Sequence, residues 1–324
     1  MGGVLMGEFV ISVRYTTKGA FGTEPGPTKF LVVPANQKDT RPAQQIARGK
    51  WVDAVLKEAK TGESTHTGKP LGDILVFIHG YNNAPPAVLK RHRLLKKDMK
   101  AQGYKGAVVS FDWPSASMAI NYLEDRSDAK KTAIKLVEDC IALFSAVQAR
   151  GCEINVHLLA HSTGAFVIRE AFDDADDRIK ISSANWSVSQ IALIGADVSS
   201  KSMSATDSKS DSVYRHCVRL TNYANPYDSV LKLSNIKRIG VSPRVGRVGL
   251  PDDIPTKAVN VDCGSYFKTL IKSEAEYDGT FSHSWHIGDD FFARDLFFTI
   301  QGDIDRDRIP TRTFDRNGRL CLEK

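Results

Sequence analysis

The chain places a serine where a buried strand should pass into a helix. The string around it reads Ala160-His161-Ser162-Thr163-Gly164. A nucleophile elbow is so tight a turn that only small residues fit two positions before and two positions after the serine. Alanine replaces the usual first glycine here, and the second glycine is retained. The string therefore predicts Ser162 as a nucleophile at the N-terminus of a helix, whose dipole stabilises developing negative charge.

A serine hydroxyl is a weak nucleophile without a base, and the base expected here is a histidine. Three of the eight histidines follow Ser162 along the chain: His216, His283 and His286. His216 directly precedes a predicted strand and so lies at the wrong end of it. The other two follow the last predicted strand of the sheet, as the serine–acid–histidine order requires. We therefore expect His283 to be the base and keep His286 as the alternative.

The acid that orients the base should lie between the serine and the histidine in sequence. Asp228 ends a turn-rich loop after the predicted strand at residues 217–220. There it would orient His283 and stabilise the imidazolium form. Asp197, which follows the predicted strand at residues 191–194, is the alternative, although its carboxylate could instead cap a helix or brace the elbow. Chain order favours Asp228.

A second loop, with the string HGYN at residues 79–82, follows the apolar run at residues 74–78. A loop in this position supplies one backbone N–H to the oxyanion, and the residue after the nucleophile supplies another. We assign these two donors to Tyr81 and Thr163. Losing one such donor costs about 3 kcal/mol of barrier lowering. His79 is expected to brace the loop through hydrogen bonds rather than to take part in the chemistry.

The elements that must position these loops are short apolar runs, which are typical of strands buried on both faces of a parallel sheet. Segments with helical spacing alternate with them, which predicts βαβ units and a mainly parallel sheet. The expected strands are residues 74–78, 107–111, 154–159, 191–194, 217–220 and 258–261, and the expected helices are residues 85–103, 125–148 and a segment from 165 onward. Residues 199–212, rich in Ser, Lys and Asp, are expected to form a loop.

The N-terminal part has a different pattern. Strands are predicted at residues 9–15 and 30–33, and a short helix at residues 51–59. We expect residues 1–70 to decorate the core or to supply antiparallel edge strands. Residues 71–324 are expected to form the α/β catalytic domain, continuous with the first part.

The motifs resemble those of the α/β-hydrolase superfamily, and within it a bacterial group of esterase/lipase-like proteins known as a domain of unknown function. That group shows a strand ending in HGYN, a WPS segment followed by a tyrosine and an aspartate, an H-S-x-G elbow and a late H-S-aromatic segment. The matching positions here are residues 77–82, Trp113-Pro114-Ser115, Tyr122 with Asp125, residues 161–164 and His283-Ser284-Trp285. They run in the same order over roughly residues 73–300.

The resemblance implies an α/β-hydrolase fold, with a mostly parallel sheet and helices on both faces. It also implies that Ser162, Asp228 and His283 hydrolyse carboxylic esters through an acyl-enzyme, without a metal or an organic cofactor. Trp113 and His161 are candidates for lining the substrate pocket, and Trp113 is equally suited to anchor a strand end. The alternatives are an acyltransferase or amidase with the same triad, or a binding module that has lost catalysis.

Composition indicates the partners and the cellular location to expect, and it says nothing about the reaction. The 324 residues carry a formal net charge of +6, and the densest basic run, residues 90–100, falls on a predicted amphipathic helix. That run is expected to be a solvated helix face, so no nucleic-acid partner is predicted. The five scattered cysteines suit reduced thiols, and no apolar run approaches the roughly 18 residues of a membrane span. With no signal-peptide pattern, we expect a cytoplasmic protein acting on a small-molecule ester. The sequence is silent on the oligomeric state.

Overall fold

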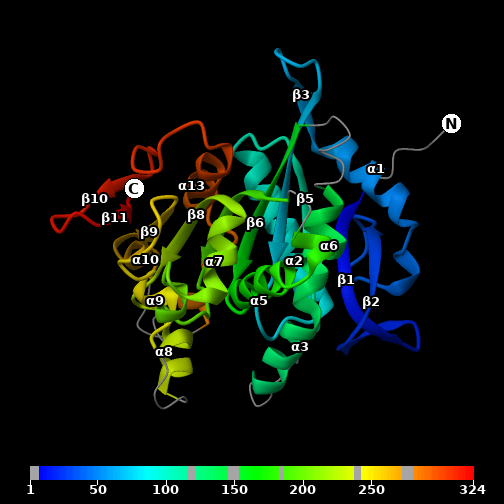
Figure 1. Ribbon diagram of the computed structural model, residues 1–324, viewed down its shortest axis with the longest axis horizontal. Coiled ribbons are helices and arrows are strands. Elements are labelled where there is room, and N and C mark those ends of the chain that lie inside the picture. The colour runs from blue at the N-terminus through cyan, green and yellow to red at the C-terminus, as the bar shows by residue number, and fades with distance from the viewer. Residues whose placement is uncertain (1–6, 116–121, 145–152, 183–185, 237–241, 272–279) are drawn as a thin grey trace.

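A mainly parallel sheet dominates the computed structural model, which describes residues 7–115, 122–144, 153–182, 186–236, 242–271 and 280–324. The strands are β1 (Glu8–Thr17), β2 (Ala20–Val33), β3 (Lys60–Glu63), β4 (Pro70–Ile78), β5 (Ala107–Asp112), β6 (Glu153–His161), β7 (Val188–Ile194), β8 (Cys217–Ala224), β9 (Ala258–Asp262), β10 (Arg312–Phe314) and β11 (Leu320–Leu322). Within the described ranges they form one sheet in the order β10-β11-β9-β8-β7-β6-β4-β5-β1-β2, with β3 beside β4 (Figure 1). Only the pairings of β2, β3 and β10 are antiparallel there, so the predicted sheet type is confirmed.

Helices cover both faces of the sheet (Figure 1). The longer helices are α1 (Arg48–Ala59), α2 (Pro85–Ala101), α3 (Tyr122–Leu136), α5 (Gly164–Asp176), α7 (Ser208–Arg215), α8 (Ser229–Ile236), α10 (Gly264–Leu270) and α13 (Asp290–Gln301). Short helical turns are η1 (Pro42–Gln44), the π-helical η3 (Val137–Ile141), α6 (Ile179–Ser182), η4 (Lys201–Met203), α9 (Val245–Val248) and α12 (Phe281–Ser284).

The sheet separates two apolar cores, because alternate side chains of a strand point to opposite faces. On β4, Ile74 and Val76 join the core that α1, α3 and α5 cover. Leu75 and Phe77 join the core that α2, α10 and α13 cover. A strand buried on both faces reads as a continuous apolar run, which is the pattern that residues 74–78 show.

The N-terminal strands are built into the same sheet. β2 is an antiparallel edge strand, whereas β1 pairs with β5 in parallel through registers such as Ile11 with Phe111. The indole N–H of Trp51, on α1, donates to the carbonyl of Leu31 on β2 (2.9 Å). Phe9 and Trp51 belong to the larger core, so this part of the chain packs directly against the rest.

The predicted elements are present, with one correction. Residues 199–212 are not a loop throughout, because α7 begins at Ser208. The Asp207 side chain accepts the N–H of Lys209 at the start of α7, and Val213 is buried in the larger core. A capping aspartate and two adjacent apolar residues, Val213 and Tyr214, gave too short a periodic signal to indicate this helix.

Two predictions fall partly outside the described residues. The helix expected at residues 125–148 begins at Tyr122 and is described as far as residue 144. Its expected end lies outside the described ranges, as do the side chains of Tyr122 and Asp125. In the part of the chain that is described, no helix has the length and apolar character needed to cross a bilayer.

Candidate active site

Loops with predicted functional residues leave one edge of the sheet. β4, β6, β7 and β8 are successive parallel neighbours, so their carboxyl ends lie side by side. β4 leads to residues 79–83, β6 to Ser162, β7 to Asp197 and β8 to Asp228. Open α/β sheets bind ligands outside the carboxyl ends of their strands. The topology thus gathers residues that are far apart in sequence.

Ser162 adopts a strained backbone conformation between β6 and α5. Its φ of 57° lies in the left-handed region, which residues with a Cβ rarely adopt. Its N–H donates to the Ile194 carbonyl (3.0 Å), and its own carbonyl accepts the N–H of Asp197 (3.1 Å). The turn is therefore tied to the loop after β7. Strain that the surroundings enforce in this way, at a serine between strand and helix, is the geometry of a nucleophile elbow.

Asp228 and His283 contact each other directly. The Nδ1 atom of His283, on α12, lies 2.6 Å from Oδ2 of Asp228. The carboxylate is fully buried, and its other oxygen accepts the N–H of Leu231 (2.9 Å). This carboxylate therefore orients the imidazole and leaves Nε2 as the ring nitrogen available for proton transfer.

Further hydrogen bonds join the loops that carry this pair. The Asn225 side chain donates to the Ser282 carbonyl (2.8 Å), and the Ser229 N–H donates to Ser282 Oγ (3.1 Å). On the other side, the backbone turns at Gly195 with a φ of 52°. A methyl group added there would lie 3.1 Å from Nδ1 of His283, so glycine is what allows the loop after β7 to approach the ring.

His161 braces the histidine of this pair. Its Nε2 lies 3.0 Å from the His283 carbonyl, and its Nδ1 lies 3.1 Å from Nη1 of Arg91 on α2. Because a guanidinium can only donate, Nδ1 must accept, and Nε2–H donates to the carbonyl. Burial lowers the pKa of His161 well below its ordinary value, and the neighbouring His283 and Arg91 lower it further. His161 is therefore a neutral ring held in one tautomer, and only 3% of it is exposed.

The expected oxyanion donors lie on both sides of the elbow. Thr163 is the N-cap of α5, where backbone N–H groups have no intrahelical partner. A methyl group added at Gly80 would lie 2.6 Å from Cβ of Ser162, so the peptide that joins Gly80 to Tyr81 passes beside the serine. This proximity is what the assignment of Tyr81 requires, and the assignment itself stays a prediction.

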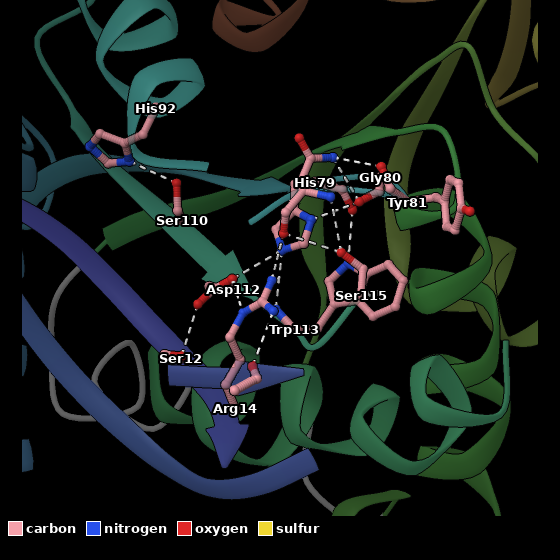
Figure 2. Close-up of polar contacts among 12 residues, drawn as sticks. Ser12, Arg14, His79, Gly80, Tyr81, His92, Ser110, Asp112, Trp113 and Ser115 are labelled. Carbon is pink, nitrogen blue, oxygen red and sulfur yellow. Dashed lines mark hydrogen bonds and ion pairs between the residues drawn. The ribbon is translucent and has the colours of Figure 1, made fainter. Parts of the chain in front are cut away.

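Trp113 and His79 stack against each other beneath that loop (Figure 2). The indole N–H of Trp113 donates to the His79 carbonyl (2.8 Å), and the Trp113 side chain is fully buried. Nδ1 of His79 lies 2.8 Å from the Gly80 carbonyl. These contacts fit the anchoring alternative for Trp113 and the bracing role expected of His79.

The alternative residues lie in different surroundings from the Asp228–His283 pair. Asp197 lies 3.0 Å from Nε of Arg244, and both side chains are buried. His286 stacks on Trp285, and neither of its ring nitrogens has a hydrogen-bond partner among the described residues. His216 contacts a carboxylate of α5, near the amino end of β8. The geometry therefore favours Asp228 and His283 over these three.

Sequence patterns alone gave no indication of Arg91. It stands within the basic run of α2, where it is indistinguishable from its solvated neighbours such as Lys90. Only the packing of α2 beside the elbow separates the two, since Arg91 contacts His161 and Lys90 is exposed. The expectation of a solvated face is therefore wrong for Arg91.

The family described as “Alpha/beta hydrolase of unknown function (DUF900)” matches residues 57–276, which is more than half of the chain. The chain belongs to this family. The α/β-hydrolase fold expected from the motifs is confirmed by this match and by the sheet topology. No curated protein matches this α/β hydrolase.

Solved structures similar to this hydrolase include three that are named as a hydrolase, a cutinase-like protein or an esterase. A putative cell surface hydrolase from Lactobacillus plantarum is 13% identical, with a TM-score of 0.39 and coverage of 71% of this chain and 90% of that one. A cutinase-like protein from Cryptococcus sp. is 11% identical, with a TM-score of 0.35 and coverage of 74% and 96%. Esterase B from Lactobacillus rhamnosis is 11% identical, with a TM-score of 0.34 and coverage of 71% and 79%. At these scores the likenesses add nothing to the argument from the family and the site.

Proposed function

We propose that this α/β hydrolase cleaves carboxylic esters, with Ser162 as nucleophile, His283 as general base and Asp228 as the acid that orients it. The observation that supports it most is the 2.6 Å contact between Asp228 and His283. That contact lies where the loops after β6, β7 and β8 converge, and Ser162 holds the elbow conformation at the end of β6.

The proposed reaction has two acyl-transfer steps. Ser162 Oγ attacks the ester carbonyl carbon while Nε2 of His283 takes its proton. The alcohol leaves with that proton, and the acyl group stays on Ser162. Water then gives a proton to Nε2 and attacks the acyl carbon, and Ser162 Oγ regains the proton as the carboxylic acid departs. Asp228 stabilises the imidazolium that forms in each step.

The oxyanion of each tetrahedral intermediate would be stabilised by the N–H groups of Thr163 and Tyr81. Thr163 contributes a backbone donor at the N-terminus of α5, where the helix dipole favours negative charge. Tyr81 contributes one from the loop beside the serine. Donors that are fixed before the reaction stabilise the developing charge without reorganisation, which is why each is worth a large factor in rate.

The experiment that tests this proposal combines a covalent probe with a substrate panel. A fluorophosphonate probe and p-nitrophenyl esters of increasing chain length are applied to the wild type, to Ser162→Ala and to a control, Ser208→Ala. Ser208 is exposed on α7, remote in sequence from the elbow. We expect labelling and turnover in the wild type and the control, and neither in Ser162→Ala. Equal turnover by wild type and Ser162→Ala would refute the proposal.

The same panel separates related activities. Adding alcohol or amine acceptors reveals an acyltransferase if the transfer product outweighs the free acid. Matched amide substrates reveal an amidase if they turn over faster than the esters. A wild-type protein that neither labels nor turns over any substrate would indicate a binding module that has lost catalysis.

A further inference from the structure

We propose that Arg14, on β1, is a positioning residue for the oxyanion loop of residues 79–83. This inference rests on the proposed function, because it concerns the donor assigned to Tyr81. β1 precedes the segment that the family match covers, which starts at residue 57. The sequence predicts this strand only as a peripheral addition to the core, yet the Arg14 side chain contacts the loop of residues 79–83.

Arg14 belongs to a buried ion pair at the end of β5. Its Nε donates to Oδ1 of Asp112 (2.7 Å), and both side chains are 1% exposed. Ser12, two residues earlier on β1, donates its hydroxyl to Oδ2 of Asp112 (2.9 Å). Figure 2 shows these side chains facing one another beneath the loop that carries Tyr81. The carboxylate therefore fixes the guanidinium in one place.

A second nitrogen of the guanidinium contacts the loop itself. Nη2 of Arg14 donates to the carbonyl of Asn83 (2.8 Å). This hydrogen bond is charge-assisted, and such bonds are about twice as strong as those between neutral groups. The Ser115 hydroxyl donates to the same carbonyl (3.3 Å) and accepts the Asn83 N–H (3.2 Å). Arg14 thus holds the residue at which the loop leads into α2.

Asn83 passes this constraint to the peptide beside the serine. Its side-chain amide donates to the carbonyls of Gly80 (2.9 Å) and Tyr81 (2.8 Å). The carbonyl of Gly80 and the N–H of Tyr81 belong to one planar trans peptide, in which they point in opposite directions. Holding the Gly80 carbonyl on Asn83 therefore fixes the direction of the Tyr81 N–H. Two successive contacts connect Arg14 to the expected oxyanion donor.

Arg14 is the positively charged partner of the buried carboxylate in this network. Burial would raise the pKa of Asp112, but Arg14 and the contact with His79 lower it below its ordinary value, so the carboxylate is ionised. Burial lowers the pKa of His79, against the opposing effect of Asp112. Nδ1 of His79 lies 2.8 Å from the Gly80 carbonyl, and its Nε2 lies 3.2 Å from Oδ1 of Asp112 and 3.3 Å from the backbone nitrogen of Trp113. Arg14 therefore neutralises the buried carboxylate of Asp112 and contacts the loop with the same guanidinium.

The test substitution removes the planar guanidinium of Arg14 and keeps its buried positive charge. Arg14→Lys can still neutralise Asp112, but a single ammonium cannot reproduce the pair of donors that a guanidinium offers. We expect kcat to fall about ten- to a hundredfold with KM changed by less than about twofold, because oxyanion contacts act mainly in the transition state. A folded Arg14→Lys protein with wild-type kcat would overturn the inference.

A matched control separates positioning from stability. Val13 is fully buried on the same strand and contributes to the larger core. Val13→Ala should lower the melting temperature by its loss of packing while kcat stays within about twofold of the wild type. If Val13→Ala loses as much kcat as Arg14→Lys at a comparable melting temperature, Arg14 acts only through stability and the inference fails.

The rate of reaction with the fluorophosphonate probe provides a readout that does not need an ester substrate. Phosphonylation of Ser162 also develops charge on an oxygen that the oxyanion donors stabilise. We expect Arg14→Lys to be labelled at least about tenfold more slowly than the wild type and Val13→Ala at the wild-type rate. If the wild type labels but cleaves no ester, the proposed function fails while this comparison still decides the role of Arg14.

Discussion

At the scale of single residues, the strained serine carries the most information. Among the described residues, three that are not glycine have a positive φ: Lys18, Asn82 and Ser162. Two of these lie in the loops that follow β4 and β6, at the candidate site. Left-handed conformations persist only where packing enforces them, and they concentrate at functional sites. The strain therefore supports a catalytic role for Ser162 independently of its sequence motif.

The two candidate acids make opposite predictions for matched substitutions. Asp228→Asn should lower kcat about 10³- to 10⁴-fold with little change in melting temperature, because the amide no longer holds His283 in the right tautomer. Asp197→Asn should leave kcat within about tenfold and lower stability by about 3–5 kcal/mol, since Arg244 would be left buried without its partner. Steady-state kinetics and thermal melts check both. If kcat fell further in Asp197→Asn than in Asp228→Asn, Asp197 would be the acid of the triad instead of Asp228.

Chain order alone leads to the expectation of Asp228 and His283, and the structure brings these two side chains into contact. Chain order could not indicate the contact between Arg91 and His161. That contact depends on how far α2 packs toward β6, and residue types within a basic helix do not encode this distance. Arg14 escaped notice for a similar reason: a lone arginine on an apolar strand has no local signature, and its partner Asp112 is 98 residues away.

At the scale of elements, the approach of the oxyanion loop to the elbow is the tightest constraint. A methyl group at Gly80 would lie 2.6 Å from Cβ of Ser162 and 2.9 Å from the His161 carbonyl. Gly80→Ala must therefore push the loop after β4 away from the loop after β6. A displacement of about 1 Å at a reacting group costs about a hundredfold in rate, so we expect kcat to fall at least that much.

Gly49→Ala is the matched control for this substitution. Gly49 lies on α1, and an added methyl group there would meet nothing within 4 Å. Alanine favours a helix over glycine by roughly 0.5–1 kcal/mol, so this variant should melt slightly higher and keep wild-type kcat. Wild-type activity in Gly80→Ala would show that the loop is not held as closely as the structure has it.

The elements themselves were largely predictable. Strands such as β4 and β6 can be predicted from their apolar runs, because both of their faces are buried. α7 did not, because its helical signal amounts to a capping residue and a few packed side chains. The basic face of α2 was misjudged in part, since Lys96 lies between Glu8 (3.1 Å) and Glu58 (2.9 Å) rather than in open solvent.

At the scale of the whole molecule, Glu8 on β1 contacts Lys96 on α2, which in turn contacts Glu58 on α1. Burial would raise the pKa of Glu8, but His92 and Lys96 lower it to about 2, from 4.5. Because the folded state lowers this pKa, the ion pair stabilises the protein above pH 4.5, and that stabilisation is lost as the pH falls toward 2.

We therefore expect Glu8→Gln to melt below the wild type at pH 6, with a difference that shrinks as the pH falls from 4.5 to 2. Thermal melts across this range check the sign. Glu24→Gln, at an exposed position on β2, is the control and should match the wild type throughout. A difference that grows on acidification would contradict the assigned role of Glu8.

A buried ion pair of an arginine and an aspartate lies near each side of the sheet. Arg14 on β1 pairs with Asp112 on β5. Arg312 on β10 lies 2.6 Å from Asp295 on α13, and both of these side chains are fully buried. The expectation of one continuous domain stays a prediction, and the two ion pairs are contacts between elements. They could not be foreseen, because partners across a sheet are set by strand order, which periodicity does not reveal.

The distance in sequence between His161 and His283 has a consequence for the protein while it is being made. The two residues are separated by 122 positions, yet the first must support the carbonyl of the second. A growing chain on the ribosome therefore exposes the elbow and its oxyanion loop long before residue 283 emerges. If the proposed function holds, the nascent polypeptide carries Ser162 without its expected base until residue 283 has left the ribosome.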